Sequence, residues 1–268
     1  MLNRIALIDG DVIAFKVAFE KKQDEESIEK YGDQTLRTFE DVKRELHYFL
    51  GSIITNVGTS HYIGFLTGKG NFRKELVPKI YKANRKGVEY PKFLFPLKKY
   101  MIEELGFINC EGIEADDALS ICQRNLDNTI ICGNDKDFKQ IPGDHYNINK
   151  KEEFNVKSSD AELFLWSQML IGDVGDNVIA IRGIGPKKAE KILEEIISSK
   201  KGIVESILSK YINSFGIYEG ICKFAYNYQC LKLLEEPNEY FSIPEPISVV
   251  KLFGSSEKVN EYGEESKE

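Results

Sequence analysis

The chain has 268 residues, of which 42% are hydrophobic and 29% are charged, and its formal net charge is −7. Such a composition is typical of a globular protein with one large or two modest domains. No apolar run approaches the roughly 20 residues that a membrane span requires, and the acidic end of the first apolar run argues against a signal peptide. Five cysteines without a CxxC pair and three scattered histidines indicate reduced thiols and no zinc site, so we expect a cytoplasmic protein.

Charge is distributed unevenly along the chain. Residues 235–268 carry nine glutamates against three lysines, which accounts for nearly all of the excess negative charge, and the end of this tail has the composition of a disordered segment. Residues 69–100 instead contain ten lysines and arginines against two glutamates. A basic block of one sign suits the binding of a polyanion.

Strands and helices are expected to alternate along the chain. The first, Arg4–Asp9, reads as a buried parallel strand that ends in an acid, and residues 20–34 read as a loop. Further strands are predicted at Tyr62–Leu66, Phe107–Cys110, Asn128–Cys132 and Tyr146–Asn149. Helices are predicted at Thr38–Thr55, Lys79–Gly87 and Pro91–Glu104, after Gly112, from Ser158 to Leu170, after Pro186, and at Ile203–Tyr211 and Ile217–Leu234. This order predicts an α/β fold with a mostly parallel sheet.

Acidic residues recur where these elements begin or end. They are Asp9 with Asp11, the triplet Glu114, Asp116 and Asp117, the pair Asp135 and Asp137, and the pair Asp173 and Asp176. Any one pair is a weak signal, and a helix dipole accounts for part of the triplet. Four groups along the carboxyl edge of a sheet indicate a site for Mg²⁺ or Mn²⁺, because the ligands are all oxygens. Two such ions about 4 Å apart would activate water and stabilise a leaving oxygen of a phosphodiester.

Two further features indicate phosphate binding. The turn Gly183-Ile-Gly185-Pro-Lys187-Lys188 precedes a helix, so its amides and lysines suit a phosphate backbone, although ordinary turn glycines between two helices are the alternative. Binding of this kind would be independent of sequence. In the basic block, a helix over Lys79–Gly87 would present Lys82, Arg85 and Lys86 on one face, with Tyr81 available for base stacking. A solvated charged face is the alternative there.

Five ordered motifs resemble the 5′-nuclease family, which includes flap endonucleases, the 5′-3′ exonuclease domain of DNA polymerase I, and phage 5′-exonucleases or ribonuclease H enzymes. They are LIDGD (Leu7–Asp11), FRKELVPKIYKANR (Phe72–Arg85), GIEADDALS (Gly112–Ser120), GNDKDFKQI (Gly133–Ile141) and GDVGDNVIAIRGIGPKKAEKIL (Gly172–Leu193). The resemblance implies a PIN-like α/β core, a helical arch and a C-terminal helix–three-turn–helix region that grips duplex DNA. The implied divisions are a catalytic core over 1–170 with an arch at about 69–100, a DNA-binding region over 171–236 and an acidic tail over 237–268.

The resemblance also implies roles for individual residues. The inner metal carboxylates would be Asp9, Asp116, Asp135 and Asp137, with Glu114 and Asp117 close by, and Asp173 and Asp176 would serve a second ion. The residues expected to act at the scissile phosphate are Lys82 and Arg85, with Arg73 contacting a phosphate. Those expected to hold duplex DNA are Gly183, Gly185, Lys187 and Lys188, where the family often has a potassium ion.

The implied activity is magnesium-dependent cleavage of phosphodiesters near 5′ ends of DNA or RNA–DNA duplexes in replication or repair. The expected partners are duplex DNA with a 5′ flap, a nick or an RNA primer, and a replication protein as a candidate for the tail. We expect a monomer in the cytoplasm, which is the host cytoplasm if a phage encodes the chain. The resemblance leaves open the balance of exonuclease and flap endonuclease activity, and the preference for DNA or RNA.

The chain departs from the family pattern at one position. The family usually has an aspartate at the end of the second strand, where this chain reads Phe65-Leu-Thr67-Gly-Lys-Gly70. Asp11 is a candidate to replace that carboxylate, and Thr67 is a candidate to hold a water in its place. The departure supports an alternative function, a catalytically weak or silent protein that binds branched DNA. A phosphatase that uses Asp9-Gly-Asp11 is a third interpretation, but it leaves the basic block and the hairpin unexplained.

Overall fold

The structure is a computed structural model in which residues 4–19, 37–76, 81–85, 87 and 89–240 are described. The chain forms two compact units: the first comprises residues 1–164 and Leu233–Glu239, and the second comprises Leu165–Lys232 with the chain from Tyr240 onward. The expected loop at 20–34 and most of the acidic tail lie outside the described residues. In the described part of the chain, no helix is long and apolar enough to cross a membrane.

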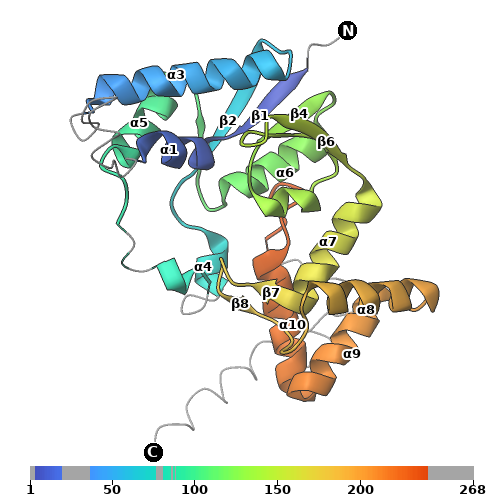
Figure 1. Ribbon diagram of the computed structural model, residues 1–268. Coiled ribbons are helices and arrows are strands. Elements are labelled where there is room, and N and C mark those ends of the chain that lie inside the picture. The colour runs from blue at the N-terminus through green and yellow to red at the C-terminus, as the bar shows by residue number, and fades with distance from the viewer. Residues whose placement is uncertain (1–3, 20–36, 77–80, 86, 88, 241–268) are drawn as a thin grey trace, which may run out of the picture. The chain divides into compact units, whose positions relative to one another are not determined.

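A six-stranded sheet forms the centre of the first unit (Figure 1). Its strands lie in the order β3 (Ile108–Cys110), β2 (His61–Thr67), β1 (Ile5–Asp9), β4 (Thr129–Gly133), β5 (Gly143–Asn147) and β6 (Glu152–Val156). All neighbouring pairs are parallel except β5 and β6. The mostly parallel sheet is therefore confirmed. Strand β6 was not predicted, because four of its five residues are exposed and it therefore lacks an apolar pattern.

Helices cover both faces of this sheet. On one face lie α1 (Gly10–Ala18), α3 (Phe39–Asn56) and α5 (Leu94–Glu103), which share a core with Ala6 and Ile8 of β1 (Figure 1). On the other lie α6 (Ala115–Asn125) and the 3-10 helix η3 (Lys136–Gln140), which share a core with Leu7. Successive residues of β1 thus pack in the cores on opposite faces of the sheet, because side chains alternate between the two faces along a strand.

Local interactions explain where two of these helices begin. The predicted start of α3 is confirmed, because the hydroxyl of Thr38 and the carboxylate of Asp41 each accept a hydrogen bond from the other's backbone amide. Helix α1, which was not predicted, begins directly after β1. Gly10 permits this sharp junction, since a Cβ there would lie 2.5 Å from the carbonyl oxygen of Phe65.

The basic block adopts less helix than the sequence predicted. Helix α4 (Phe72–Leu76) is followed by residues 77–80, which are outside the described part, and then by a turn and the short 3-10 helix η2 (Ala83–Arg85). Lys82 has a positive φ of 53°, which is incompatible with an α-helix through this position. The predicted single helical face of Lys82, Arg85 and Lys86 is therefore wrong for the residues that are described.

Three helices and a short hairpin make up most of the second unit. It contains the end of α7 (Ser158–Ile171), the strands β7 (Gly172–Asp173) and β8 (Val178–Ile179), and the helices α8 (Pro186–Ser198), α9 (Ile203–Phe215) and α10 (Ile217–Leu231). Tyr211 is fully buried, and its hydroxyl donates to the carbonyl of Met169 at 2.6 Å and accepts from Asn227 at 2.9 Å. Helices α9 and α10 approach closely at Gly220, where a Cβ would lie 2.7 Å from the Cα of Ile212.

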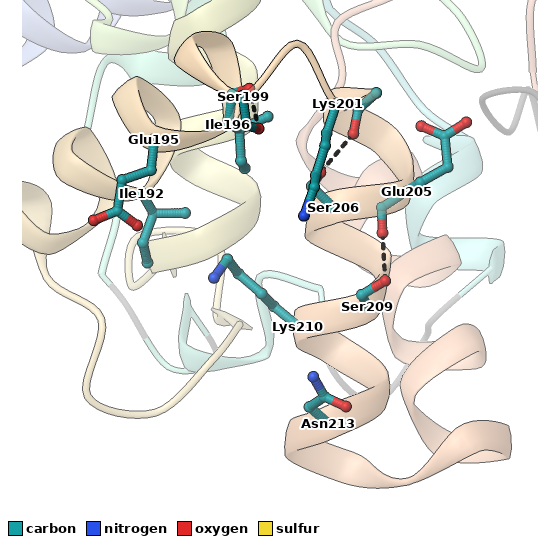
Figure 2. Close-up of a pocket in the computed structure, with 11 residues that line it drawn as sticks. Ile192, Glu195, Ile196, Ser199, Lys201, Glu205, Ser206, Ser209, Lys210 and Asn213 are labelled. Carbon is teal, nitrogen blue, oxygen red and sulfur yellow. Dashed lines mark hydrogen bonds between the residues drawn. The ribbon is translucent and has the colours of Figure 1, made fainter.

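An open pocket of about 660 Å³ lies between α8 and α9 (Figure 2). Its lining includes Ile192 and Ile196 together with Glu195, Lys201, Lys210 and several serines. Charges of both signs line it, so it is not a one-signed surface for a phosphate backbone. The residues with predicted chemistry lie elsewhere.

Candidate metal centre and nucleic-acid contacts

Asp9 is a buried member of the predicted set of metal ligands. It is the last residue of β1 and caps α1, so its Oδ1 accepts a hydrogen bond from the amide of Val12 at 3.2 Å. Its exposed fraction is 1%. Burial raises the pKa of Asp9 to about 7, and the charges of Asp11 and Asp135 add to the effect. The sequence missed the capping role because it did not predict α1.

Asp116 and Asp135 lie beside Asp9. Asp116 is in the first turn of α6, and burial together with the charges of Asp9 and Asp135 raises its pKa well above the usual range. Asp135 follows β4 and caps η3, where its Oδ1 accepts from the amide of Asp137 at 2.8 Å. The end of β4 passes against Asp9, since a Cβ at Gly133 would lie 3.1 Å from the Cβ of Asp9. The structure thus brings three of the predicted carboxylates together.

This group of carboxylates fits a hard divalent cation. The charge of Asp135 disfavours the ionised forms of Asp9 and Asp116, and the donors are oxygens only, which Mg²⁺ and Mn²⁺ prefer. A cation would offset the repulsion that raises these pKa values. Among the described residues, however, no three histidine, cysteine, aspartate or glutamate side chains are arranged as a complete ligand set for one ion. Asp9, Asp116 and Asp135 are the residues that would hold the ion.

Both carboxylate oxygens of Asp117 accept hydrogen bonds from other residues of the protein. Both of its oxygens bind the guanidinium of Arg73, at 2.6 and 2.8 Å, and they also accept from the amides of Glu114 and Leu234, each at 3.1 Å. Asp117 and Arg73 are 0% and 1% exposed. In this structure Asp117 therefore binds an arginine, and Arg73 is buried against it. The metal role of Asp117 and the phosphate contact of Arg73 stay predictions.

Glu114 accepts hydrogen bonds from the basic segment. Tyr81 donates to its Oε2 at 2.8 Å, and Lys82 pairs with its Oε1. Burial alone would raise the pKa of Glu114, but the charges of Lys82 and Arg73 outweigh it and lower the pKa. Tyr81 is 3% exposed, so the predicted stacking of its ring on a base is wrong. The partner of Lys82, Glu114, lies two residues before Asp116, and the charge of Lys82 acts to lower the pKa of Asp116.

Thr67 ends β2 where the family usually has an aspartate. Its hydroxyl accepts a hydrogen bond from the amide of Ala115 at 2.9 Å, and its own amide donates to Asp11 at 3.1 Å. The threonine thus binds the start of α6, one residue before Asp116. Sequence reasoning missed this contact, because it depends on two loops that are distant in the chain.

Asp173 and Asp176 lie in the second unit. Asp173 is 3% exposed, and its Oδ1 accepts from the amides of Gly175 and Asp176 at 2.7 and 3.3 Å. These contacts shape the turn between β7 and β8. The binding of a second ion by Asp173 and Asp176 stays a prediction.

The predicted phosphate-binding turn precedes α8, as expected. Gly183 has a φ of 79°, Gly185 is the N-cap residue without a side-chain cap, and Pro186 occupies the first turn. Lys187 and Lys188 are exposed, and Lys188 donates to the carbonyl of Gly183 at 3.3 Å. This arrangement can present amides and lysines to an anion.

The fold and the carboxylate group together define an α/β protein with the PIN-like architecture of nucleases. The family model described as "5'-3' exonuclease, N-terminal resolvase-like domain" matches residues 4–164. The chain therefore belongs to this 5′-3′ exonuclease family, as its motifs predicted.

Two relatives illustrate how far the likeness extends. DNA polymerase I of Lactococcus lactis subsp. cremoris is 28% identical over 229 residues, which are 76% of this chain and 25% of that protein. The chain thus spans about a quarter of the length of such polymerases. A 5′-3′ exonuclease of Mycoplasma pneumoniae is 25% identical over 233 residues, which are 79% of this chain and 76% of that protein.

Solved structures of a phage protein share the fold. A complex of the bacteriophage T5 D15 flap endonuclease with DNA and metal ions has a TM-score of 0.63 at 20% identity and covers 86% of this chain and 89% of that chain. The T5 5′-exonuclease with divalent zinc ions gives the same TM-score, identity and coverage. The agreement confirms the expected PIN-like fold.

Removal of Arg73 will test its structural role. Arg73→Met leaves the Asp117 charge buried without its partner, which should cost about 3–5 kcal/mol in the free energy of unfolding. Urea denaturation will measure it. Arg44→Met is the matched control, because Arg44 is 78% exposed and its pair with Asp41 should contribute less than about 1 kcal/mol. Equal stability of the two variants, with loss of DNA binding only for Arg73→Met, would support the predicted contact of Arg73 with a phosphate.

The carboxylate group should make stability depend on pH and metal together. The folded-state pKa of Asp9, about 7, exceeds its usual value of 3.8, so its contribution is fully present below the usual value and is lost as pH rises through about 7. Without metal, the melting temperature should therefore be lower at about pH 8 than at about pH 5. Mg²⁺ should raise it more at the higher pH.

Asp9→Asn provides the control for this pH dependence. Asparagine keeps an oxygen that can cap α1 but cannot ionise. The metal-free variant should therefore lose less stability between the two pH values than the unmodified protein. A pH profile unchanged by the substitution would show that Asp9 is not the responsible group.

Proposed function

We propose that the chain is a magnesium-dependent, structure-specific 5′-nuclease that hydrolyses phosphodiesters near the 5′ ends of DNA or RNA–DNA duplexes. The observation that carries the proposal is the convergence of Asp9, Asp116 and Asp135 at one edge of the sheet in a member of the 5′-3′ exonuclease family. Support comes also from the T5 flap endonuclease, which shares the fold and was solved with DNA and metal ions.

Divalent ions bound at these carboxylates would supply an activated water and positive charge for the leaving oxygen. The carboxylates of Asp9, Asp116 and Asp135 would orient the ions, and Asp173 and Asp176 are proposed to serve a second one. Mn²⁺ should be able to replace Mg²⁺, because both prefer oxygen ligands. The chemistry needs no histidine, in agreement with the composition of the group.

Lys82 is proposed to bind the scissile phosphate. Its ammonium pairs with Glu114 beside the carboxylate group, so it lies where a phosphate would approach the ions. A cation at that position would offset the charge that the phosphate gains in the transition state. Arg85 follows three residues later in η2 and is proposed to assist Lys82. Glu114 would then hold Lys82 in place until the substrate arrives.

The second unit is proposed to hold the duplex. Gly183, Gly185, Lys187 and Lys188 form an exposed turn at the start of α8, which suits a phosphate backbone without reading bases. A potassium ion at this turn, a monomeric state and a replication protein as partner are further parts of the proposal. Duplexes with a 5′ flap, a nick or an RNA primer are the proposed substrates.

A cleavage assay will test the activity. A duplex with a labelled 5′ flap, incubated with Mg²⁺, should give short products, and Asp135→Ala should reduce the rate at least about 100-fold. Asp127→Ala is the matched control, because Asp127 is exposed and lies in the turn after α6. Products from flap, nicked and RNA-primed substrates would rank the proposed substrates.

The same assay distinguishes a protein that only binds branched DNA. Thr67 stands where the family has a carboxylate, which is the observation in favour of that alternative. Tight binding of the flap substrate without any Mg²⁺-dependent product would establish the alternative and refute the nuclease.

The role of Lys82 can be tested separately. Lys82→Ala should slow single-turnover cleavage by about 100- to 1000-fold, the usual cost of losing one stabilising donor at a developing charge. The Kd for duplex DNA should change by less than about threefold, because the duplex is proposed to be held elsewhere. Equal losses in rate and affinity would contradict a role at the scissile phosphate.

A further inference from the structure

Asp11 is held on two sides by groups from other elements. It lies in the first turn of α1, two residues after Asp9. The ammonium of Lys98, from α5, binds its Oδ1 at 2.6 Å. The amide of Thr67, at the end of β2, donates to its Oδ2 at 3.1 Å. The side chains of Lys98 and Asp11 are 25% and 29% exposed, so the pair is partly shielded from water.

These contacts connect the elements that carry the proposed metal ligands. Lys98 binds Asp11, whose own helix begins at Asp9. Asp11 accepts from Thr67, and the hydroxyl of Thr67 accepts from Ala115, the residue before Asp116. The series of hydrogen bonds therefore runs from α5 through α1 and β2 to the start of α6. A change at Lys98 would be transmitted to both carboxylates without any contact to the ion.

We propose that Lys98 is a positioning residue that keeps Asp11 out of the metal ligand set, so that the Lys98–Asp11 pair sets the affinity of the site for divalent cations. The inference rests on the proposed function, because it takes Asp9 and Asp116 to hold the ion. Asp11 could otherwise replace the carboxylate that β2 lacks. With Lys98 bound to one oxygen and the Thr67 amide to the other, both oxygens of Asp11 already have donors and its orientation is fixed.

Substitutions at Lys98 and at Asp11 should change the affinity for the divalent cation in opposite directions. Lys98→Met removes a positive charge and releases one oxygen of Asp11, so the site gains negative charge and a further ligand. Asp11→Asn leaves the positive charge of Lys98 without its partner near the ion. The first variant should bind the cation more tightly and the second more weakly, each by roughly three- to tenfold. The double variant should lie close to the unmodified protein, because the two changes act through one pair.

Binding of Mn²⁺ alone, followed by the loss of the free-ion EPR signal, will test this without DNA or turnover. Lys98→Arg should keep the affinity of the unmodified protein, because arginine can retain the ion pair. Lys99→Met is the matched control, since Lys99 lies next to Lys98 in α5 but pairs with Glu103 at 3.8 Å and is 73% exposed. Its affinity for Mn²⁺ should be unchanged. Melting temperatures will show that each variant is folded.

The outcomes separate this inference from the proposed function. Tighter binding by Lys98→Met, and its reversal in the double variant, would establish the positioning role. Weaker or unchanged binding by Lys98→Met, while the unmodified protein binds Mn²⁺, would overturn the inference alone. An unmodified protein that binds no Mn²⁺ would overturn the metal site and the inference with it.

Discussion

The buried carboxylate of Asp117 is the interaction on which the first unit most depends. It binds the guanidinium of Arg73 from α4 and accepts the amides of Glu114, at the start of α6, and of Leu234, near the end of the described chain. Three segments far apart in the sequence are thus fixed to one side chain. A charge in such surroundings is tolerated only when nearly every lone pair has a donor, and Asp117 meets that condition.

The neighbouring acids have the opposite character. Asp9 is buried and Asp116 is partly buried, and both lie among other carboxylates, so their ionised forms are disfavoured. Asp116 and Asp117 are adjacent in the chain, but the helix directs them to different surroundings. Asp116 lies among other carboxylates, and Asp117 binds an arginine and backbone amides.

Much of the sheet could be predicted from the sequence, because several of its strands are short apolar runs. The predicted strands Arg4–Asp9, Tyr62–Leu66 and Asn128–Cys132 correspond to β1, β2 and β4. The capping box at Thr38 could also be predicted, since it depends on two residues that are three positions apart. Predictions succeeded where the determining contacts are local in the chain.

The predictions failed where the residues in contact are distant from each other in the chain. Nothing in the spacing of Arg73, Tyr81 or Asp117 reveals that the arginine and the tyrosine are buried against the acids of α6, because those contacts span more than 30 residues. Helix α10 ends at Leu231, earlier than its apolar pattern indicates, since Leu233 and Leu234 pack with the first unit instead. A sequence pattern shows that a residue is apolar or charged. It does not show which core the residue packs in or which partner it contacts.

The return of Leu233–Glu239 to the first unit makes the second unit an insertion rather than an appendage. The chain leaves the first unit after Phe164 and comes back at Leu233, so both ends of the inserted part are covalently tied to the same body. In evolutionary terms, the inserted part could be lengthened, shortened or exchanged between those two fixed points. It could not be lost by simple truncation, because the returning segment supplies the Leu234 amide that Asp117 requires.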